Sequence, residues 1–292
     1  MKPDAACAAC LFKWVYERTG VSANYEQHFP LIRSILEVLS QEFYSATNLG
    51  LMTNRIIEAV DEFMLQSAPY YERFRFKSNQ FAKELLPSAE HFIDKGQTDQ
   101  EKFIRACCLA AVGNIAPLGG PTESFKFQEV IDLVAGKSPF PIIAGDIFAL
   151  VKKAKQVLYI TDNSGEIGFD TFLISQLKKM GLRVTLFVKE EHFFEDATMK
   201  DASFFNLDQS ADNILSAKGL FMPSRSPSPL TDVLHQCDLV ISKGTGNYEA
   251  LQGEVDGKPI IYMLKIKCKP IAMKMGAGIG TFIVKIDNQK EA

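Results

Sequence analysis

Five short, almost wholly apolar runs follow residue 150, and they constrain the fold more than any other feature of this 292-residue chain. The runs are residues 157–161, 183–188, 238–242, 259–264 and 281–284. A strand has this composition when helices cover both of its faces, as in a parallel sheet. Segments with helical spacing, such as residues 169–180, separate the runs. The alternation predicts an α/β fold with a Rossmann-like, mostly parallel sheet flanked by helices.

The first half of the chain has a different periodicity. From about residue 7 to residue 151, apolar residues recur at the spacing of amphipathic helices. Four breakers interrupt this pattern: Pro30, Pro69, Pro87 and the stretch 117–121. We expect helices to end near these breakers. The sequence therefore predicts an all-helical N-terminal region, residues 1–150, packed against a Rossmann-like α/β domain, residues 151–292, that binds metal and phosphate.

Composition narrows the possible partners and the location. A net charge of −3 leaves no basic excess for nucleic acid, whereas a small anionic substrate needs only local basic residues. No stretch approaches the roughly 18 apolar residues of a membrane helix, and the N-terminus lacks a signal-peptide core. We therefore expect a soluble cytoplasmic protein with no membrane partner.

Six cysteines are compatible with that compartment. Cys107 and Cys108 lie in an apolar helical run and are expected in the core. Cys7 and Cys10 form a single CxxC pair, which is weak support for zinc without a second pair or nearby histidines. Two interpretations of this pair stay open: burial at the start of a helix, or a redox or auxiliary metal role.

Polar residues follow the first apolar run directly, beginning with Asp162 and Asn163. In open α/β sheets, ligands bind at the carboxyl ends of the strands. Carboxylate and amide oxygens suit Mg²⁺ or Mn²⁺, and Gly165 would let the chain turn into a helix. The alternative is an ordinary helix cap. One cap needs one polar residue, whereas Ser164 and Glu166 follow as well, so the pattern favours a functional site.

Two further runs end in residues that could join this site. Glu195 and Asp196 follow the second run, and a carboxylate there could complete a cation site beside Asp162. By themselves they read as an acidic loop. Gly244 and Gly246 follow the third run and open a helix, which lets backbone N–H groups approach a phosphate. This spacing is not a dinucleotide fingerprint, because the third glycine position is not glycine.

The fourth run is followed by lysines at alternating positions, Lys265, Lys267 and Lys269. Such a series is usually a solvated edge, although one lysine could neutralise a substrate phosphate. The sequence has no GxSxG nucleophile motif. Ser164 stands where an aspartyl-phosphate phosphatase would have its second aspartate, which disfavours a covalent aspartyl-phosphate.

Together these motifs resemble the damage-control phosphatase family, which was long catalogued as a domain of unknown function and includes acidic-residue methyltransferase-like proteins. The motifs are Asp162-Asn163-Ser164-Gly165-Glu166, Glu195-Asp196-Ala197-Thr198, Lys243-Gly244-Thr245-Gly246-Asn247-Tyr248-Glu249 and Leu264-Lys265. The CxxC pair, Pro69-Tyr70, Ser78-Asn79 and Gly113-Asn114 resemble its prokaryotic branch. The resemblance covers nearly the whole chain. It implies a helical region packed on a Rossmann-like domain and metal-dependent hydrolysis of phosphate monoesters.

The resemblance also implies roles for particular residues. The metal would be held by Asp162, Asn163 and Asp196, and Lys265 would bind the phosphate. The resemblance names Asn79 and Asn114 as substrate-binding candidates. The chain departs from the family at Ala68 and near Pro117, where relatives often carry aspartate. The substrate is therefore expected to differ, or the activity to be lower.

The leading hypothesis is hydrolysis of small phosphorylated metabolites by metal-activated water, with Mn, Mg, Ni or Co as the divalent cofactor. Charge on the phosphoryl oxygens would be stabilised by Lys265 and by four residues of one loop: Gly244, Thr245, Gly246 and Asn247. Glu166 would fix Asn163 or a water. One alternative is S-adenosylmethionine-dependent carboxyl methyl transfer, which the clustered acids disfavour because a methyl donor needs no cation. The other is a non-catalytic phosphosugar-binding module.

Overall fold

The computed structural model describes residues 1–116, 123–190, 193–225, 228–255 and 257–288. In these ranges the helices are α1 (Cys7–Thr19), a 3₁₀ turn (Gly20–Ser22), α2 (His28–Glu42), α3 (Leu49–Ala59), α4 (Asp61–Asp94), α5 (Asp99–Val112), α6 (Gln128–Val134), α7 (Ile147–Val151), α8 (Glu166–Lys179), α9 (Met199–Phe204), α10 (Leu207–Ser210), α11 (Ser228–Gln236), α12 (Thr245–Leu251) and α13 (Lys269–Met275). The strands are β1 (Ile142–Ala144), β2 (Gln156–Ile160), β3 (Arg183–Lys189), β4 (Asn213–Ala217), β5 (Leu239–Lys243), β6 (Pro259–Lys265) and β7 (Phe282–Asn288). Within the described ranges, no helix combines the length and apolar character needed to cross a bilayer.

All seven strands belong to one sheet, in the order β1-β7-β6-β5-β2-β3-β4. Neighbouring strands are parallel except β6 and β7, which are antiparallel. The five apolar runs correspond to β2, β3, β5, β6 and β7, so the predicted α/β class with a mostly parallel sheet is confirmed. The order reverses direction between β2 and β5, which places a crevice at their carboxyl ends.

The strands β1 and β4 were not expected from the sequence. Both lie at the edges of the sheet, where one side of the strand has no neighbour. Their residues are mostly exposed or half-buried, with only Ala217 buried. Because an edge strand need not be apolar on both faces, it lacks the continuous apolar run that identified the inner strands. The boundary between residues 150 and 151 stays a prediction, although β1 lies before it.

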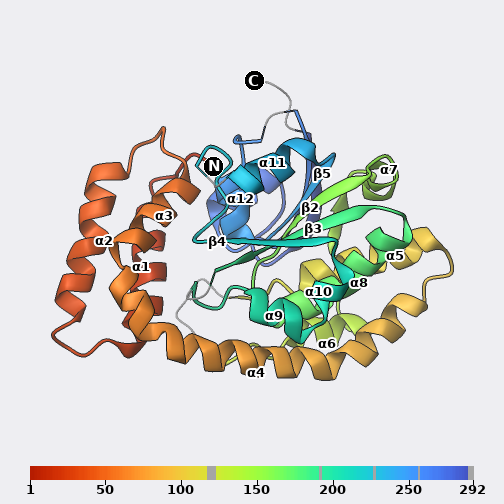
Figure 1. Ribbon diagram of the computed structural model, residues 1–292, viewed down its shortest axis with the longest axis horizontal. Helices are drawn as coiled ribbons and strands as arrows, with labels where there is room; N and C mark the ends of the chain where they lie inside the picture. Colours follow the sequence, from red (N-terminus) through yellow and green to blue (C-terminus); the bar gives the residue numbers. More distant parts are fainter. Residues whose placement is uncertain (117–122, 191–192, 226–227, 256, 289–292) are drawn as a thin grey trace.

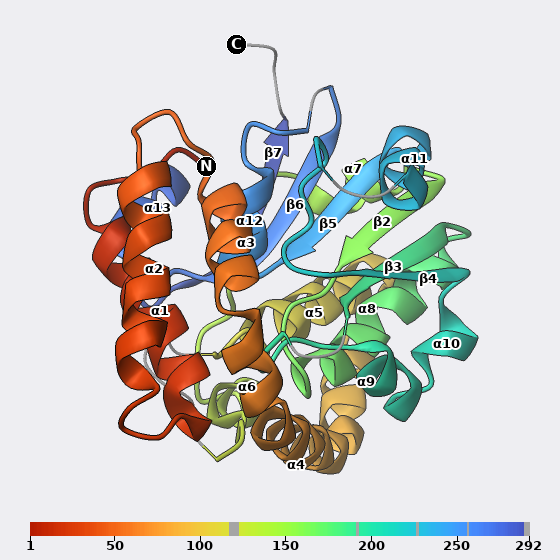
Figure 2. The ribbon, with the colours of Figure 1, turned by 60° about the vertical axis from the view of Figure 1, so that its left-hand side comes forward.

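Helices cover both faces of the sheet, and strand residues alternate between two apolar clusters. Val157 and Tyr159 face a cluster that contains α4, α5, α6 and α8. Leu158 and Ile160 face the other cluster, which contains α1, α2, α3, α12 and α13. Figure 1 shows α4 as a long helix along one edge, and Figure 2 shows α1–α3 gathered at one side of the sheet.

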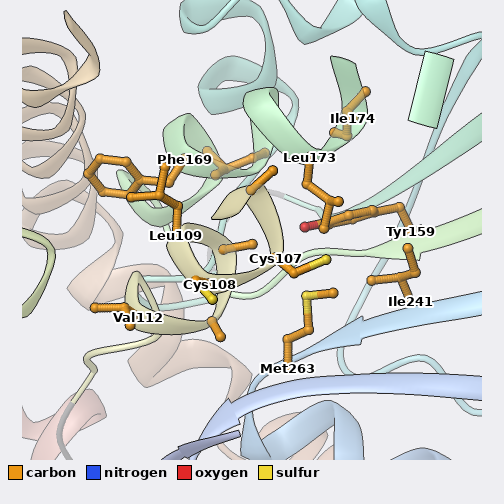
Figure 3. Packing of buried hydrophobic residues seen from close by; sticks show 14 of the residues in the cluster. Cys107, Cys108, Leu109, Val112, Tyr159, Phe169, Leu173, Ile174, Ile241 and Met263 are labelled. Carbon is orange, nitrogen blue, oxygen red and sulfur yellow. The ribbon is translucent and has the colours of Figure 1, made fainter. Parts of the chain in front are cut away.

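The predicted burial of Cys107 and Cys108 is confirmed, since neither is exposed to solvent. Both lie on α5 and pack among residues of three strands and of α8 (Figure 3). The neighbours include Tyr159 of β2, Ile241 of β5 and Met263 of β6. A helix from the first half of the chain is therefore part of the layer that buries the sheet, which is how α/β folds stabilise their central strands.

The expectation that Pro69 and Pro87 end helices is wrong, because both lie inside the 34-residue helix α4. Each proline leaves the carbonyl four residues earlier without its helical hydrogen bond. Those residues, Leu65 and Lys83, are exposed, as are the prolines themselves. Water can bond the free carbonyls there, so the helix continues. Pro30 likewise lies inside α2, in its first turn, where a missing N–H costs little.

Candidate active site

A cleft of about 240 Å³ opens where the carboxyl ends of the inner strands meet the N-terminal helices. Its polar lining includes Asp162, Asn163, Glu195, Asp196, Thr245, Gly246 and Lys267. These residues follow β2, β3, β5 and β6, whose ends the parallel sheet brings to one side. A larger hollow of about 440 Å³ beside β3 and β4 has neither Asp162 nor Asp196 in its lining. The cleft at the strand ends is therefore the candidate active site.

Backbone hydrogen bonds join the segment after β2 to the segment after β3. Asn163 and Asp196 form an isolated antiparallel bridge. Ser164 N donates to the Glu195 carbonyl at 2.9 Å, and Ala197 N donates to the Asp162 carbonyl at 2.8 Å. These bonds hold the two polar segments beside each other independently of the conformations of their side chains. The proximity of Asp162, Asn163 and Asp196 is thus built into the backbone.

The carboxylate of Asp162 is held by two amides. The Nδ2 atoms of Asn114 and Asn163 donate to its Oδ2 at 2.6 and 2.7 Å. Gly244 lies directly against the carboxylate: a Cβ at that position would be 2.1 Å from Asp162 Oδ2. Gly244 also has φ +79°, a conformation that favours glycine. Its place in the site is therefore to let the backbone after β5 approach Asp162.

A buried ion network lies behind Asp162. Lys243 Nζ donates to Glu166 Oε1 and to Asp170 Oδ1, both at 2.7 Å, and none of the three side chains is more than 1% exposed. Tyr159 Oη donates to the same Asp170 oxygen at 2.8 Å. Burial raises the pKa of Asp170 to about 6, although Lys243 lowers it. The network fixes Glu166, which in turn accepts from Asn114 and Asn163.

Asp162 and Asp196 have few ion-pair partners at close range, although the charge of Lys267 acts on Asp162. In the described part of the chain, no lysine or arginine nitrogen lies within 4.0 Å of Asp162, and Asp196 has only Lys189 Nζ at 3.8 Å. Burial and the Glu166 charge raise the pKa of Asp162 to about 6. Burial and Asp162 raise the pKa of Asp196 well above its ordinary value. A cation between these carboxylates would relieve both effects.

The donor set fits a hard divalent cation. The amide nitrogen of Asn163 is used by Asp162 and Glu166, which leaves its Oδ1 to act as a ligand. Among the described residues, no three His, Cys, Asp or Glu side chains gather so that they could hold a metal by themselves. Two carboxylates, one amide oxygen and water are nevertheless a common arrangement for Mg²⁺, which keeps several of its waters.

Lys265 and Lys267 occupy different places. Lys265 Nζ donates to Glu129 of α6 at 2.9 Å and lies over the ring of Phe282. Lys267 lines the cleft with Asp162, and burial lowers the pKa of its ammonium group, although the Asp162 charge raises it. β6 ends at Lys265, so the alternation of the three lysines does not continue to Lys267. The assignment of phosphate binding to Lys265 stays a prediction, whereas the geometry favours Lys267.

The remaining predicted residues are divided between the cleft and its support. Thr245 and Gly246 line the cleft. Asn247 accepts from Lys189 Nζ at 3.2 Å and donates to the carbonyls of Thr161 and Lys243. Asn79 is buried in α4, where it accepts from Gly165 N and donates to Asp201, both at 2.6 Å. Asn79 and Asn247 therefore position loops rather than face the cleft.

Gly165 is the turn into α8, and it lets Glu166 bond the same two amides, Asn114 and Asn163, that hold Asp162. It has φ +68°, and a Cβ there would lie 2.7 Å from the Ser78 carbonyl oxygen. Of the two positions where the chain departs from the family, Ala68 is buried in α4, and Pro117 lies outside the described residues. Ala116, the neighbour of Pro117, lines the cleft.

Several cleft residues were not predicted. Arg18 of α1 pairs with Glu195 at 2.6 Å, and both side chains are buried. Trp14, Cys7, Cys10 and Glu249 also line the cleft. The sequence does carry a signal for two buried lysines near the cleft: Lys189 and Lys243 each follow an apolar run, and a lysine buried at a strand end requires carboxylates nearby. No such signal indicates that α1 lines the cleft, because α1 lies far from the strand ends in the sequence.

The sequence and the fold of this chain are similar to those of known proteins. The family model of the damage-control phosphatase ARMT1-like domain matches residues 4–283. A damage-control phosphatase of Archaeoglobus fulgidus is 29% identical, over 98% of this chain and 99% of its own. A damage-control phosphatase of Pyrococcus horikoshii is 24% identical over 85% of this chain and 84% of its own. A crystal structure of a DUF89 family protein of P. horikoshii, 23% identical, superposes with a TM-score of 0.81, covering 99% of this chain and all of that one.

Proposed function

Because the chain belongs to the damage-control phosphatase ARMT1-like domain family, we propose that it is a metal-dependent phosphatase of small phosphate monoesters, such as sugar phosphates or damaged phosphometabolites. Relatives named damage-control phosphatases support a hydrolase. The observation that carries the metal dependence is the pair Asp162 and Asp196. Both carboxylates lie at the polar end of the cleft, and both have raised pKa values.

Asp162, Asn163 and Asp196 would hold the divalent cation, which when bound supplies phosphoryl polarisation and a water of lowered pKa. Asn114 orients Asp162 by donating to Oδ2, so the other carboxylate oxygen faces away from that amide. Glu166 in turn holds the amides of Asn114 and Asn163. The ligands are therefore fixed before the substrate arrives, which is what catalysis by positioning requires.

Lys267 is the cleft lysine that we assign to the phosphoryl group. It lines the cleft with Asp162, and the Asp162 charge raises the pKa of its ammonium group. The backbone at Thr245 and Gly246 borders the same space and opens α12, so its N–H groups are suited to phosphoryl oxygens. Preorganised donors of this kind stabilise the charge that develops on the oxygens during transfer.

The proposal is tested by replacing Asp162. Purified protein is assayed with p-nitrophenyl phosphate after treatment with a chelator and after addition of Mn²⁺, Mg²⁺, Ni²⁺ or Co²⁺. We expect the chelator to remove the activity and at least one metal to restore it. Asp162→Ala should abolish the metal-dependent hydrolysis while circular dichroism stays that of the parent. Full activity in Asp162→Ala, or in the chelated parent protein, contradicts the proposal.

A further inference from the structure

One part of the cleft lining is polar and another part is apolar. The polar end of the cleft is the cation and phosphate site described above. Adjacent to it, α1, α3 and the segments before α9 and α11 contribute five apolar side chains, which form an apolar wall: Leu11, Trp14, Leu49, Phe193 and Leu220. Trp14 is half-buried, whereas the other four are at most 7% exposed. An organic group attached to a phosphate at the polar end would lie against this wall.

Two polar side chains of α1 and α3 that border this wall, Arg18 and Thr53, are already bonded to the protein. Thr53 Oγ1 donates to the Leu49 carbonyl at 2.9 Å. The Arg18 guanidinium donates from Nη2 to Glu195 at 2.6 Å and from Nε at 2.9 Å. A sugar lying here would bury hydroxyl groups against carbon, and each buried hydroxyl without a partner is costly. Thr245 and Glu249, which do border the cleft, belong to α12 rather than to this wall.

Trp14 is held in place for contact with a ligand. The ring of Phe194 meets it edge-on, with centroids 5.2 Å apart. The Arg18 guanidinium lies 5.1 Å from its ring centroid. These contacts restrict the indole ring in the free protein. Binding a ligand would therefore cost little side-chain entropy at Trp14. Aromatic side chains of this kind provide large apolar contact area.

From this arrangement we infer that the preferred substrates are phosphate monoesters whose organic part is apolar, aliphatic or aromatic, with Trp14 as the specificity-determining residue. The inference rests on the proposed phosphatase function and narrows its substrate class. Phosphate esters of polyhydroxylated groups would bind the same polar end, but they would gain nothing from the α1 and α3 wall.

The test compares two substrates with similar leaving groups, 2-phenylethyl phosphate and glycerol 3-phosphate, both esters of primary alcohols. We expect kcat/KM to be at least tenfold higher for the phenylethyl ester. Trp14→Ala should lower that value about tenfold and change the glycerol ester less than about twofold. Phe12→Ala is the matched control, since Phe12 lies on α1 but is not among the cleft residues and stacks on Tyr16. It should leave the ratio unchanged.

Equal rates for the two esters, or an equal loss of both in Trp14→Ala, overturn the inference. A binding measurement tests the substrate preference separately from the proposed phosphatase function. Calorimetry with 3-phenylpropylphosphonate and methylphosphonate, which are not hydrolysed, is made on the parent and both variants. Tighter binding of the phenylpropyl compound that is lost in Trp14→Ala supports the inference even if neither ester is hydrolysed. Equal binding of the two phosphonates, or no binding of either, overturns it.

Discussion

At the scale of the residue, the site depends on which charges have partners. Glu166 and Asp170 share the buried Lys243, and Glu195 has Arg18. Among the residues that the structure describes, Asp162 forms no ion pair within 4.0 Å, and Asp196 has only Lys189 at 3.8 Å. Two buried like charges that are this poorly compensated disfavour ionisation unless a cation binds. Lys265, which ends β6, and Lys267, which follows it, differ in the same way, because in the described part of the chain only Lys265 forms an ion pair, with Glu129.

The two lysines should therefore respond differently to replacement. We expect Lys267→Met to lower kcat/KM for p-nitrophenyl phosphate on the order of 100-fold, the effect of losing a preorganised charged donor. Lys265→Met should lower it at most a few-fold, because its ammonium group bonds Glu129 and only its backbone N reaches Asn114. Steady-state kinetics at saturating metal measures both. A larger loss in Lys265→Met than in Lys267→Met would mean that Lys265, and not Lys267, binds the phosphate.

At the scale of the element, glycine conformation decides how closely the strand ends approach. The turn from β5 into α12 is built by Gly244, with φ +79°, and Gly246 follows two residues later. The two glycines look equivalent in the sequence. A Cβ on Gly244 would strike Asp162 at 2.1 Å, whereas a Cβ on Gly246 would meet Leu220 at 3.5 Å, an ordinary contact. The element therefore needs glycine at the first position only.

Alanine substitution tests this difference. Gly244→Ala should lower the free energy of unfolding by about 2 kcal/mol or more, since it combines an unfavourable φ with a clash against Asp162. Gly246→Ala should keep or slightly raise it, because alanine favours helix by up to about 1 kcal/mol. Urea unfolding of the metal-free proteins measures both values. Equal effects of the two substitutions would contradict the geometry at Gly244.

At the scale of the whole molecule, the N-terminal helices and the sheet form one unit around the cleft. Arg18 of α1 reaches Glu195, 177 residues later, and Tyr71 Oη donates to the Arg18 carbonyl at 3.0 Å. Arg75 of α4 donates to the Phe194 carbonyl at 2.6 Å. These buried contacts join α1 and α4 to the segment that carries Asp196. The stability of the whole chain and the geometry of the site are therefore linked.

Removing Arg18 tests that link. Arg18→Met leaves Glu195 charged and buried without its partner, which typically costs about 3–5 kcal/mol. Adding Glu195→Gln removes the unpaired charge, so we expect the double variant to be more stable than Arg18→Met alone. Urea unfolding gives the three free energies. A cost below about 1 kcal/mol for Arg18→Met would mean that the pair does not hold α1 in place.

Stability should also depend on pH through Glu249 of α12. Burial raises the pKa of Glu249 to about 7, above its ordinary 4.5. Between these values the folded protein binds more protons than the unfolded chain, so this group lowers stability as pH rises from 4.5 to 7. Glu249→Gln removes the effect. Its gain in unfolding free energy over the parent should be near zero at pH 4.5 and grow by at most about 1.4 kcal/mol per pH unit. A gain in unfolding free energy that does not change with pH would contradict the raised pKa of Glu249.

The sequence by itself determined the α/β class, the five inner strands and the polar residues that follow them. It could do so because a strand buried on both faces must be apolar, and because parallel strands bring their carboxyl ends together. It could not identify the edge strands β1 and β4, or the continuation of α4 through Pro69 and Pro87, since exposed positions place weak demands on composition.

The tertiary structure alone decided which side chains share the cleft. Lys267 rather than Lys265 lines the cleft with Asp162, because the chain leaves strand geometry after β6 and alternation no longer predicts on which side a lysine lies. Trp14 and Arg18 join the site from α1, nearly 150 residues before Asp162. Contacts between segments so distant in sequence depend on how the helices pack on the sheet, and no local pattern in either segment encodes them.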